Sequence, residues 1–165
     1  MRYSIVYSTR TGNTKLLAET VRTALPEDGC VYCGEPDARA LEADRVYVGF
    51  WTDRGSCNQE TAEFLKTLDQ QEVFLFGSAG FGASSEYFDA VLERTSANLK
   101  DGSKVVGTFM CQGRMPLSVR ERYMKMKESA MPVPNLDRMI ENFDTALSHP
   151  NDDDLAHLTS AVLAR

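Results

Sequence analysis

The sequence has no apolar run long enough to cross a membrane, and it is short of positive charge. A membrane-spanning helix needs about 20 consecutive apolar residues, so we expect no membrane segment. Lys and Arg number 18 against 24 Asp and Glu, which gives a net charge of −6. A chain of this charge is repelled by nucleic acid and by anionic lipid, so we expect neither as a partner. Met1 and Arg2 lead into a strand-like run rather than a signal peptide, and the expected location is the cytoplasm.

Histidine and cysteine are also scarce, which restricts acid–base and metal chemistry. The two histidines, His149 and His157, lie in a helical tail, where we expect surface or helix-capping roles. The four cysteines are Cys30, Cys33, Cys57 and Cys111. Cys30 and Cys33 have the spacing of a redox pair or of half a zinc site. Their segment reads as a strand, in which residues three apart point to opposite faces, so we expect buried free thiols and no metal site.

Strand and helix patterns alternate along the first two thirds of the chain. The strand candidates are Arg2–Tyr7, Cys30–Cys33, Arg45–Trp51, Glu72–Ser78 and Lys104–Cys111. The helix candidates between them are Asn13–Leu25, Asn58–Leu68 and Ser84–Leu99. Several strands are almost continuously apolar, as expected of strands that are buried on both faces. The alternation therefore predicts one α/β domain with a parallel sheet that is covered by helices.

A hydroxyl-rich loop after the first strand is the most informative motif. It runs from Ser8 to Thr14 and reads Ser-Thr-Arg-Thr-Gly-Asn-Thr. The start of the following helix offers unpaired backbone amides and the positive end of its dipole, which together attract an anion. The hydroxyls of Thr9, Thr11 and Thr14 can donate to that anion, and Gly12 lets the backbone approach it closely. The loop lacks the Lys of a triphosphate P-loop and the glycine spacing of a dinucleotide fingerprint. The alternative is an ordinary capped turn, although three hydroxyls exceed what capping needs.

The run Thr9-Arg10-Thr11-Gly12-Asn13-Thr14 resembles the Thr-x-Thr-Gly-x-Thr loop of flavodoxins, which wraps the phosphate of FMN. Its place directly after the first strand also resembles that family, and the resemblance covers Met1 to about Cys111. It implies a flavodoxin-like, doubly wound sheet of five parallel strands in the order 2-1-3-4-5. It also implies FMN as the cofactor. The phosphate-binding residues would be Ser8, Thr9, Arg10, Thr11, Gly12, Asn13 and Thr14.

The flavin ring needs a slot, which the resemblance places at the loops after the third and fourth strands. Trp51, the only tryptophan, ends the third strand, where flavodoxins commonly place a stacking aromatic. We therefore expect Trp51 and Thr52 to contact the ring, with core packing as the alternative for Trp51. Many members of the family have a glycine beside this aromatic, whereas here the next glycine is Gly55.

The loop after the fourth strand, residues 77–82, has three glycines, which predicts close approach of the backbone to a ligand. The expected cofactor contacts here are Ser78, Ala79, Gly80 and Phe81. Phe81 or Tyr87 would supply the second stacking face, and the sequence leaves that choice open. A glycine-rich turn without ligand contact is the alternative. The segment Cys111–Met115, after the last strand, is a third candidate loop.

After Cys111 the pattern changes to helices only, so we expect a single domain over residues 1–165 with a core of 1–111 and a helical part of 112–165. The helices are predicted at about Leu117–Ala130, from a cap at Asn135 to Leu147, and at about Asp152–Ala164. One of the last two should occupy the position of the final flavodoxin helix. The basic residues of the first suit a partner-docking or nicotinamide-phosphate patch, or a solvated face. The tail resembles that of small flavodoxin-domain proteins of anaerobic bacteria, some of which accompany reductases such as bilirubin reductase.

The resemblance implies an FMN-binding electron carrier, with a reductase as donor and a redox enzyme as acceptor. We expect a monomer whose acidic surface docks on basic partners, as electron carriers of this charge do. Stacking on Trp51 and an acidic surround would lower the flavin potential. No acid–base pair is evident, so no catalytic residue is assigned. The alternatives are a stand-alone NAD(P)H-dependent FMN or quinone oxidoreductase, and a flavin-less interaction module.

Overall fold

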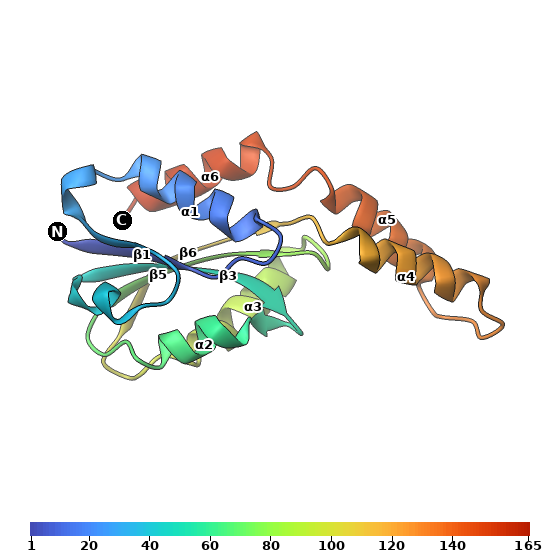
Figure 1. The fold of residues 1–165 in the computed structure, drawn as a ribbon, viewed down its shortest axis with the longest axis horizontal. Helices are drawn as coiled ribbons and strands as arrows, with labels where there is room; N and C mark the ends of the chain where they lie inside the picture. The colour runs from blue at the N-terminus through green and yellow to red at the C-terminus, as the bar shows by residue number, and fades with distance from the viewer.

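A parallel sheet forms the centre of the molecule in the computed structural model, which describes residues 1–165 (Figure 1). Its strands are β1 (Tyr3–Tyr7), β2 (Cys30–Gly34), β3 (Arg45–Asp53), β5 (Glu72–Ala79) and β6 (Lys104–Gln112). The spatial order is β2-β1-β3-β5-β6, and each neighbouring pair is parallel. Counted along the chain, this is the predicted order 2-1-3-4-5, which is confirmed. The short strand β4 (Ser56–Cys57) was not predicted, and it pairs antiparallel with the end of β3.

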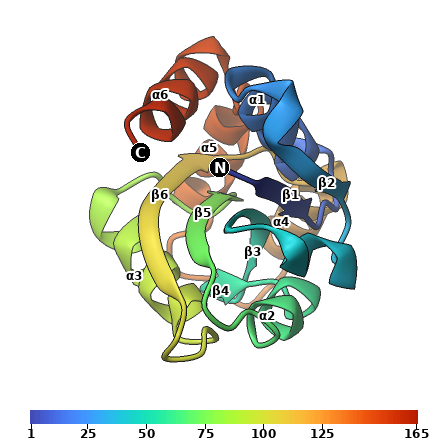
Figure 2. The same cartoon turned by 90° about the vertical axis from the view of Figure 1, so that its left-hand side faces the viewer.

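Helices cover both faces of the sheet (Figure 2). The helices α1 (Asn13–Ala24) and α6 (Asp152–Leu163) lie side by side on one face, and α2 (Gln59–Leu65) and α3 (Ser85–Ser96) lie on the other. The α1 side buries a cluster that includes Ile5, Leu17, Phe74 and Leu158. The α2 side buries a cluster that includes Val48, Phe50, Leu65 and Val91. Two apolar clusters explain why the central strands are apolar on both faces.

The helix α6 takes the position that the sequence left open between two candidates, since it packs against α1 and β6. Asn151 begins it with a capping box: its Oδ1 accepts from the Asp154 amide at 3.0 Å, and Asp154 Oδ2 accepts from the Asn151 amide at 2.8 Å. The ring of His149 lies 2.6 Å from Asp154 Oδ2, so His149 contacts the carboxylate of the capping box without itself capping the helix. Asn135 stands at the N-cap position of α5 (Leu136–Ala146), as predicted. Unlike Asn151, it has a φ of 62° and its side chain makes no capping hydrogen bond.

The helices α4 (Leu117–Glu128) and α5 (Leu136–Ala146) form a hairpin that extends away from the sheet beyond its carboxyl edge (Figure 1). A separate small core of Tyr123, Leu136 and Phe143 holds the two helices together. The Arg114 amide donates to the His149 carbonyl at 3.0 Å, so the two ends of the hairpin segment meet. The hairpin is therefore built as an insertion between β6 and α6.

The two cysteines of β2 lie on the same face of the sheet, so the expectation of opposite faces is wrong. The pairing of β2 skips Val31, because Cys30 pairs with Tyr3 and the next paired residue is Tyr32. A bulge of one residue resets the alternation of a strand. Cys30 and Cys33 therefore both pack on the α1-side cluster, while Tyr32 packs on the α2 side. All four cysteines are free, as expected, although two of them are only half-buried.

The remaining regular elements are two short 3-10 helices, η1 (Glu27–Gly29) and η2 (Ala38–Glu42), which flank β2. The predicted helices are confirmed, with shorter ends: the one predicted to reach Leu68 stops at Leu65, and the one predicted to reach Leu99 stops at Ser96. None of the helices has both the length and the apolar character that a membrane crossing requires.

Candidate functional site

The phosphate loop, residues 8–14, joins the end of β1 to the start of α1. Gly12 occupies the N-cap position with a φ of 91°, and no side chain caps the helix. A Cβ added to Gly12 would meet no atom within 4 Å, so the approach to the loop is open. The amides of the first helical turn lack intrahelical acceptors. An uncapped helix start with an open approach is the arrangement that anion binding requires.

The hydroxyl groups of the loop differ in their partners. Thr14 is 1% exposed, and its Oγ1 has no hydrogen-bond partner. Thr9 Oγ1 accepts from the Gly12 amide at 3.1 Å, which leaves its own proton available to a ligand. Ser8 Oγ donates to Glu60 Oε2 at 3.0 Å and is already satisfied. A buried hydroxyl without a partner costs about 1–3 kcal/mol, so Thr14 fits an acceptor such as a phosphate oxygen.

Asn13 connects the phosphate loop to the segment after β6. Its Nδ2 donates to the Arg114 carbonyl at 2.9 Å, while its buried Oδ1 has no partner. A Cβ on Gly113 would lie 2.6 Å from Asn13 Nδ2 and 3.1 Å from Ser78 Oγ. Glycine at position 113 therefore lets the start of α1, the end of β5 and the segment after β6 meet at one point.

The segment after Trp51 is a tight hairpin rather than an open loop. Asp53 pairs with Ser56, and the two residues between them, Arg54 and Gly55, have φ values of 52° and 82°. Two successive positive φ values are typical of the type I′ turn. Gly55 thus serves the turn itself, which explains why the glycine stands four residues after Trp51 rather than beside it.

Two side chains fix this hairpin to its neighbours. Thr52 Oγ1 donates to the Ser78 carbonyl at 2.9 Å, which joins the hairpin to β5. Arg94 Nη1 donates to the Gly55 carbonyl at 3.0 Å, which joins it to α3. The Thr52 hydroxyl is therefore used within the protein, and its backbone is held in place.

Trp51 is half-buried and belongs to neither buried cluster of the sheet, so the core-packing alternative is not supported. The guanidinium of Arg10 lies over the indole ring, 5.5 Å from the ring centroid. Arg10 is exposed, and a cation above an exposed aromatic face gains only about 0.5–1 kcal/mol. This contact is weak enough for a stacking ligand to replace it.

A crevice of about 520 Å³ lies between these segments and α4. The predicted contacts that line it are Arg10, Thr11, Asn13, Trp51, Thr52, Ser78, Gly80 and Phe81. The predicted residues outside its lining are Ser8, Thr9, Gly12, Thr14 and Ala79. The first four of these belong to the adjoining phosphate loop. Ala79 is 2% exposed, so its side chain is part of the protein interior rather than of the crevice.

The choice of a second stacking aromatic stays open. Phe81 and Tyr87 both line the crevice. Phe81 is 54% exposed, whereas Tyr87 is half-buried, and burial raises the pKa of the Tyr87 hydroxyl. Both rings line the same crevice as Trp51.

The charge of the crevice is opposite to the expectation. Its charged lining residues are Arg10, Arg54, Arg114, Arg122 and Asp53. None of the four arginines takes part in an ion pair of the structure. The prediction of an acidic surround is therefore wrong at this site. Net charge does not say where charges lie, and Arg122 reaches the crevice only because the α4–α5 hairpin packs beside it.

Asn142 on α5 fixes the segment after β5, and sequence reasoning missed it. Its Oδ1 accepts from the Gly82 amide at 3.2 Å and from Gln112 Nε2 at 3.0 Å, and its Nδ2 donates to the Gly80 carbonyl at 2.7 Å. A Cβ on Gly80 would lie 2.3 Å from Cγ of Met115, so this segment also packs closely on the start of the hairpin. No local motif marks Asn142, because its partners lie at least 30 residues away.

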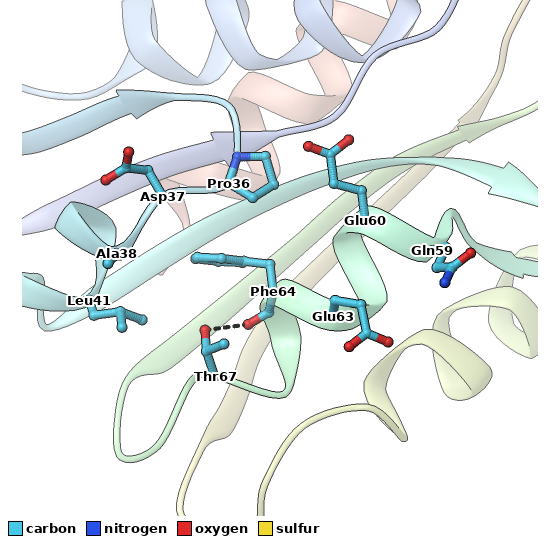
Figure 3. A pocket seen from close by; sticks show the side chains of 9 residues that line it. All are labelled: Pro36, Asp37, Ala38, Leu41, Gln59, Glu60, Glu63, Phe64 and Thr67. Carbon is cyan, nitrogen blue, oxygen red and sulfur yellow. Dashed lines mark hydrogen bonds between the residues drawn. The ribbon is translucent and has the colours of Figure 1, made fainter.

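A second hollow, of about 740 Å³, lies between η2 and α2 (Figure 3). Its charged side chains are the carboxylates of Asp37, Glu60 and Glu63, with no Lys or Arg among the lining residues. Hydrogen bonds from Arg39 lower the pKa of Asp37 to about 2, so this carboxylate is ionised at neutral pH. A hollow with three carboxylates does not suit a phosphorylated ligand, and the arginine-lined crevice is the candidate site.

The comparisons with known proteins agree with this geometry. A family model of the flavodoxin domain matches residues 4–163. The flavodoxin-like domain-containing protein BilS of Clostridium symbiosum is 39% identical over an alignment of 173 positions, gaps included, which covers 94% of this chain and 91% of the relative. Oxidised flavodoxin 2 from Bacillus cereus has the same fold, with a TM-score of 0.57 and 15% identity, over 99% of this chain and 97% of its own. A flavoprotein from Lactobacillus acidophilus, solved in complex with FMN, has a TM-score of 0.50 and 15% identity, over 67% of this chain and 93% of its own. The chain belongs to the flavodoxin domain family, whose cofactor is FMN.

Proposed function

We propose that this protein holds FMN and carries electrons between redox proteins. The observation that supports this most directly is the phosphate loop, where the buried Thr14 hydroxyl has no partner beside an uncapped helix start. A phosphate monoester suits that site, because it accepts hydrogen bonds from amides and hydroxyls and is stabilised by the helix dipole. One phosphate site and no second nucleotide-binding half favour FMN over FAD.

The flavin ring belongs, in this proposal, in the crevice beside Trp51. Thr11, Trp51, Thr52, Gly80 and Phe81 line it on the side of the phosphate loop and would hold the ring. When bound, FMN supplies the redox chemistry, and the protein positions it and tunes its surroundings. The bonds of Thr52 and Asn142 keep the two ring-binding segments in place without the cofactor.

An electron carrier fits this crevice better than an enzyme that transforms a substrate. Asp53 is its only carboxylate, and no histidine or cysteine lines it. General acid–base pairs and activated nucleophiles are most often built with such groups. The proposed donor is a flavodoxin reductase and the proposed acceptor a redox enzyme.

Four free thiols suit the reducing cytoplasm, which is the location we propose.

A second candidate function is that of a stand-alone NAD(P)H-dependent oxidoreductase. The observation that favours it is the group of four arginines around the crevice, since guanidinium groups bind phosphates well. The flavin-less interaction module is disfavoured, because such a module would have no use for an unpartnered hydroxyl in the phosphate loop.

The source of the electrons separates the two functions. We expect NADPH alone to reduce the FMN-loaded protein slowly, and NADPH with a catalytic amount of flavodoxin reductase to reduce it readily. The flavin absorbance under anaerobic conditions measures both rates. Fast oxidation of NADPH by the isolated protein, above all with a quinone as acceptor, would replace the carrier with the oxidoreductase.

A further inference from the structure

The opening of the crevice is a basic surface on an acidic protein. Arg10, Arg54, Arg114 and Arg122 are all exposed there, and none of them is neutralised by an ion pair. They come from four separate segments: the phosphate loop, the turn after β3, the segment after β6, and α4. With a net charge of −6 over the chain, this concentration of positive charge is local.

An exposed aromatic side chain lines the same crevice as these arginines. It is Phe81, which is 54% exposed. Arginine and aromatic side chains are enriched in protein–protein interfaces and in the residues that contribute most to binding. A single exposed apolar residue needs no explanation, but a large exposed aromatic that lines one crevice with four unpaired arginines has the composition of an interface.

Resting on the proposed function, we propose that this arginine-ringed opening docks an acidic face of a redox partner protein. The phosphate loop offers its own amides and hydroxyls to the FMN phosphate, and Arg54, Arg114 and Arg122 belong to other segments of the crevice lining. Asp53 is the one carboxylate among these lining residues, and it pairs with none of the arginines, so the positive charge exceeds the negative charge there. Guanidinium groups pair with carboxylates through two parallel hydrogen bonds, which fixes orientation as well as contact. Docking here brings the partner to the opening of the flavin crevice.

The positive charge of this surface is opposite in sign to the net charge of the chain, so it favours an acidic partner where the net charge alone would favour a basic one. Two acidic proteins repel each other at long range, and only contact through the arginine ring turns the interaction attractive at short range. Arg120 is not part of the ring, because it pairs with Asp144 of α5 at 2.8 Å. Salt screens repulsion and attraction alike, and because the contact itself is between arginines and carboxylates, we expect docking of an acidic partner to weaken as ionic strength rises.

The test uses the FMN-loaded protein and two redox proteins of opposite charge. The protein is reduced anaerobically with dithionite and mixed rapidly with oxidised rubredoxin, which is acidic, or with oxidised cytochrome c, which is basic. We expect the rubredoxin rate to fall about tenfold from low to high ionic strength, and the cytochrome c rate to stay level or rise.

The double variant Arg54→Glu/Arg122→Glu should lower the rubredoxin rate at low salt about tenfold and raise the cytochrome c rate. Arg22→Glu is the control, because Arg22 lies in the last turn of α1, away from the loop at the start of that helix. It should leave both rates within about twofold. An unchanged flavin spectrum checks that each variant is folded, and the salt dependence of the unaltered protein tests the proposal without any variant.

The proposal is overturned if cytochrome c is favoured at low salt, or if the double variant behaves like Arg22→Glu. In either case the proposed function stands, since FMN is bound and electrons are transferred. Failure to retain FMN would overturn both. Fast reduction by NADPH that the double variant abolishes would assign the arginines to a nucleotide and so reject protein docking.

Discussion

Thr14 is the residue on which the assignment of the phosphate site depends most. Burial of a hydroxyl without a partner destabilises the protein, and Thr14 Oγ1 is in that position. We expect Thr14→Val to weaken FMN binding by about 1–3 kcal/mol, because a hydrogen bond to a charged phosphate is lost. Without FMN the variant should be at least as stable, because valine has nearly the same shape and leaves no unpaired oxygen.

Fluorescence titration with FMN measures the affinity, and thermal unfolding of the cofactor-free protein measures the stability. Thr23→Val is the matched control, because the Thr23 hydroxyl donates to the Glu19 carbonyl further along the same helix. An unchanged affinity in Thr14→Val would mean that the hydroxyl does not face the phosphate.

Arg10 determines the charge nearest to Trp51, since its guanidinium lies over the indole. Reduction adds negative charge to the flavin, so a nearby cation stabilises the reduced form and raises the potential. We expect Arg10→Gln to lower the two-electron midpoint potential by about 10–20 mV, from about 0.5–1 kcal/mol for an exposed charge pair. Equilibration with a reference dye measures it, with Arg22→Gln as the control. A higher potential in Arg10→Gln would place the guanidinium away from the ring.

At the scale of elements, the parallel strands and their helices could be predicted because their signals are local. Apolar runs of strand length alternate with amphipathic stretches, and the phosphate loop lies between the first two elements. The short strand β4 was missed because its two residues carry no apolar pattern. The bulge at Val31 was missed because it depends on how β2 pairs with β1, and the residues of β2 alone do not determine that pairing.

Asn142 shows how an element of the hairpin supports the site. Three of its hydrogen bonds hold the segment after β5 and the end of β6. We expect Asn142→Ala to lower the free energy of unfolding by about 1–3 kcal/mol, because the partners, which are buried or half-buried, lose their bonds. FMN affinity should fall as well, since Gly80 and Gly82 are released. Glu141→Ala, an exposed neighbour on α5, should change neither. A normal FMN affinity in Asn142→Ala would show that the hairpin does not hold the ring-binding segment in place.

At the scale of the whole molecule, the sequence predicted the fold and the position of the loop between β1 and α1, but not the charge of the crevice beside it. The arginines that surround it are separated by up to 112 positions along the chain, from Arg10 to Arg122. Arg122 joins the other three only because α4 lies beside the crevice, whereas the sequence showed α4 only as a helix with basic residues. The net charge of the chain was therefore a poor guide to the charge at its site.

The α4–α5 hairpin packs apart from the rest of the fold, so the sheet and its covering helices should fold without it. Its ends meet at Arg114 and His149, and its small core is separate from the two clusters of the sheet. We expect a variant that replaces residues 115–148 with a short glycine linker to fold and to unfold cooperatively, with weaker FMN binding. Circular dichroism and thermal unfolding measure this. Loss of cooperative unfolding would show that the hairpin is an integral part of the core.

The central claim is that the loop at residues 8–14 holds the phosphate of FMN, and comparison of three flavins tests it most directly. The cofactor-free protein is titrated with FMN, riboflavin and FAD, with flavin fluorescence as the signal. Riboflavin lacks the phosphate, so we expect it to bind about 100-fold more weakly than FMN or worse, from two or more charge-assisted bonds of about 1.5–3 kcal/mol each. FAD should also bind more weakly than FMN. Equal affinity for riboflavin and FMN, or a preference for FAD, would contradict the account.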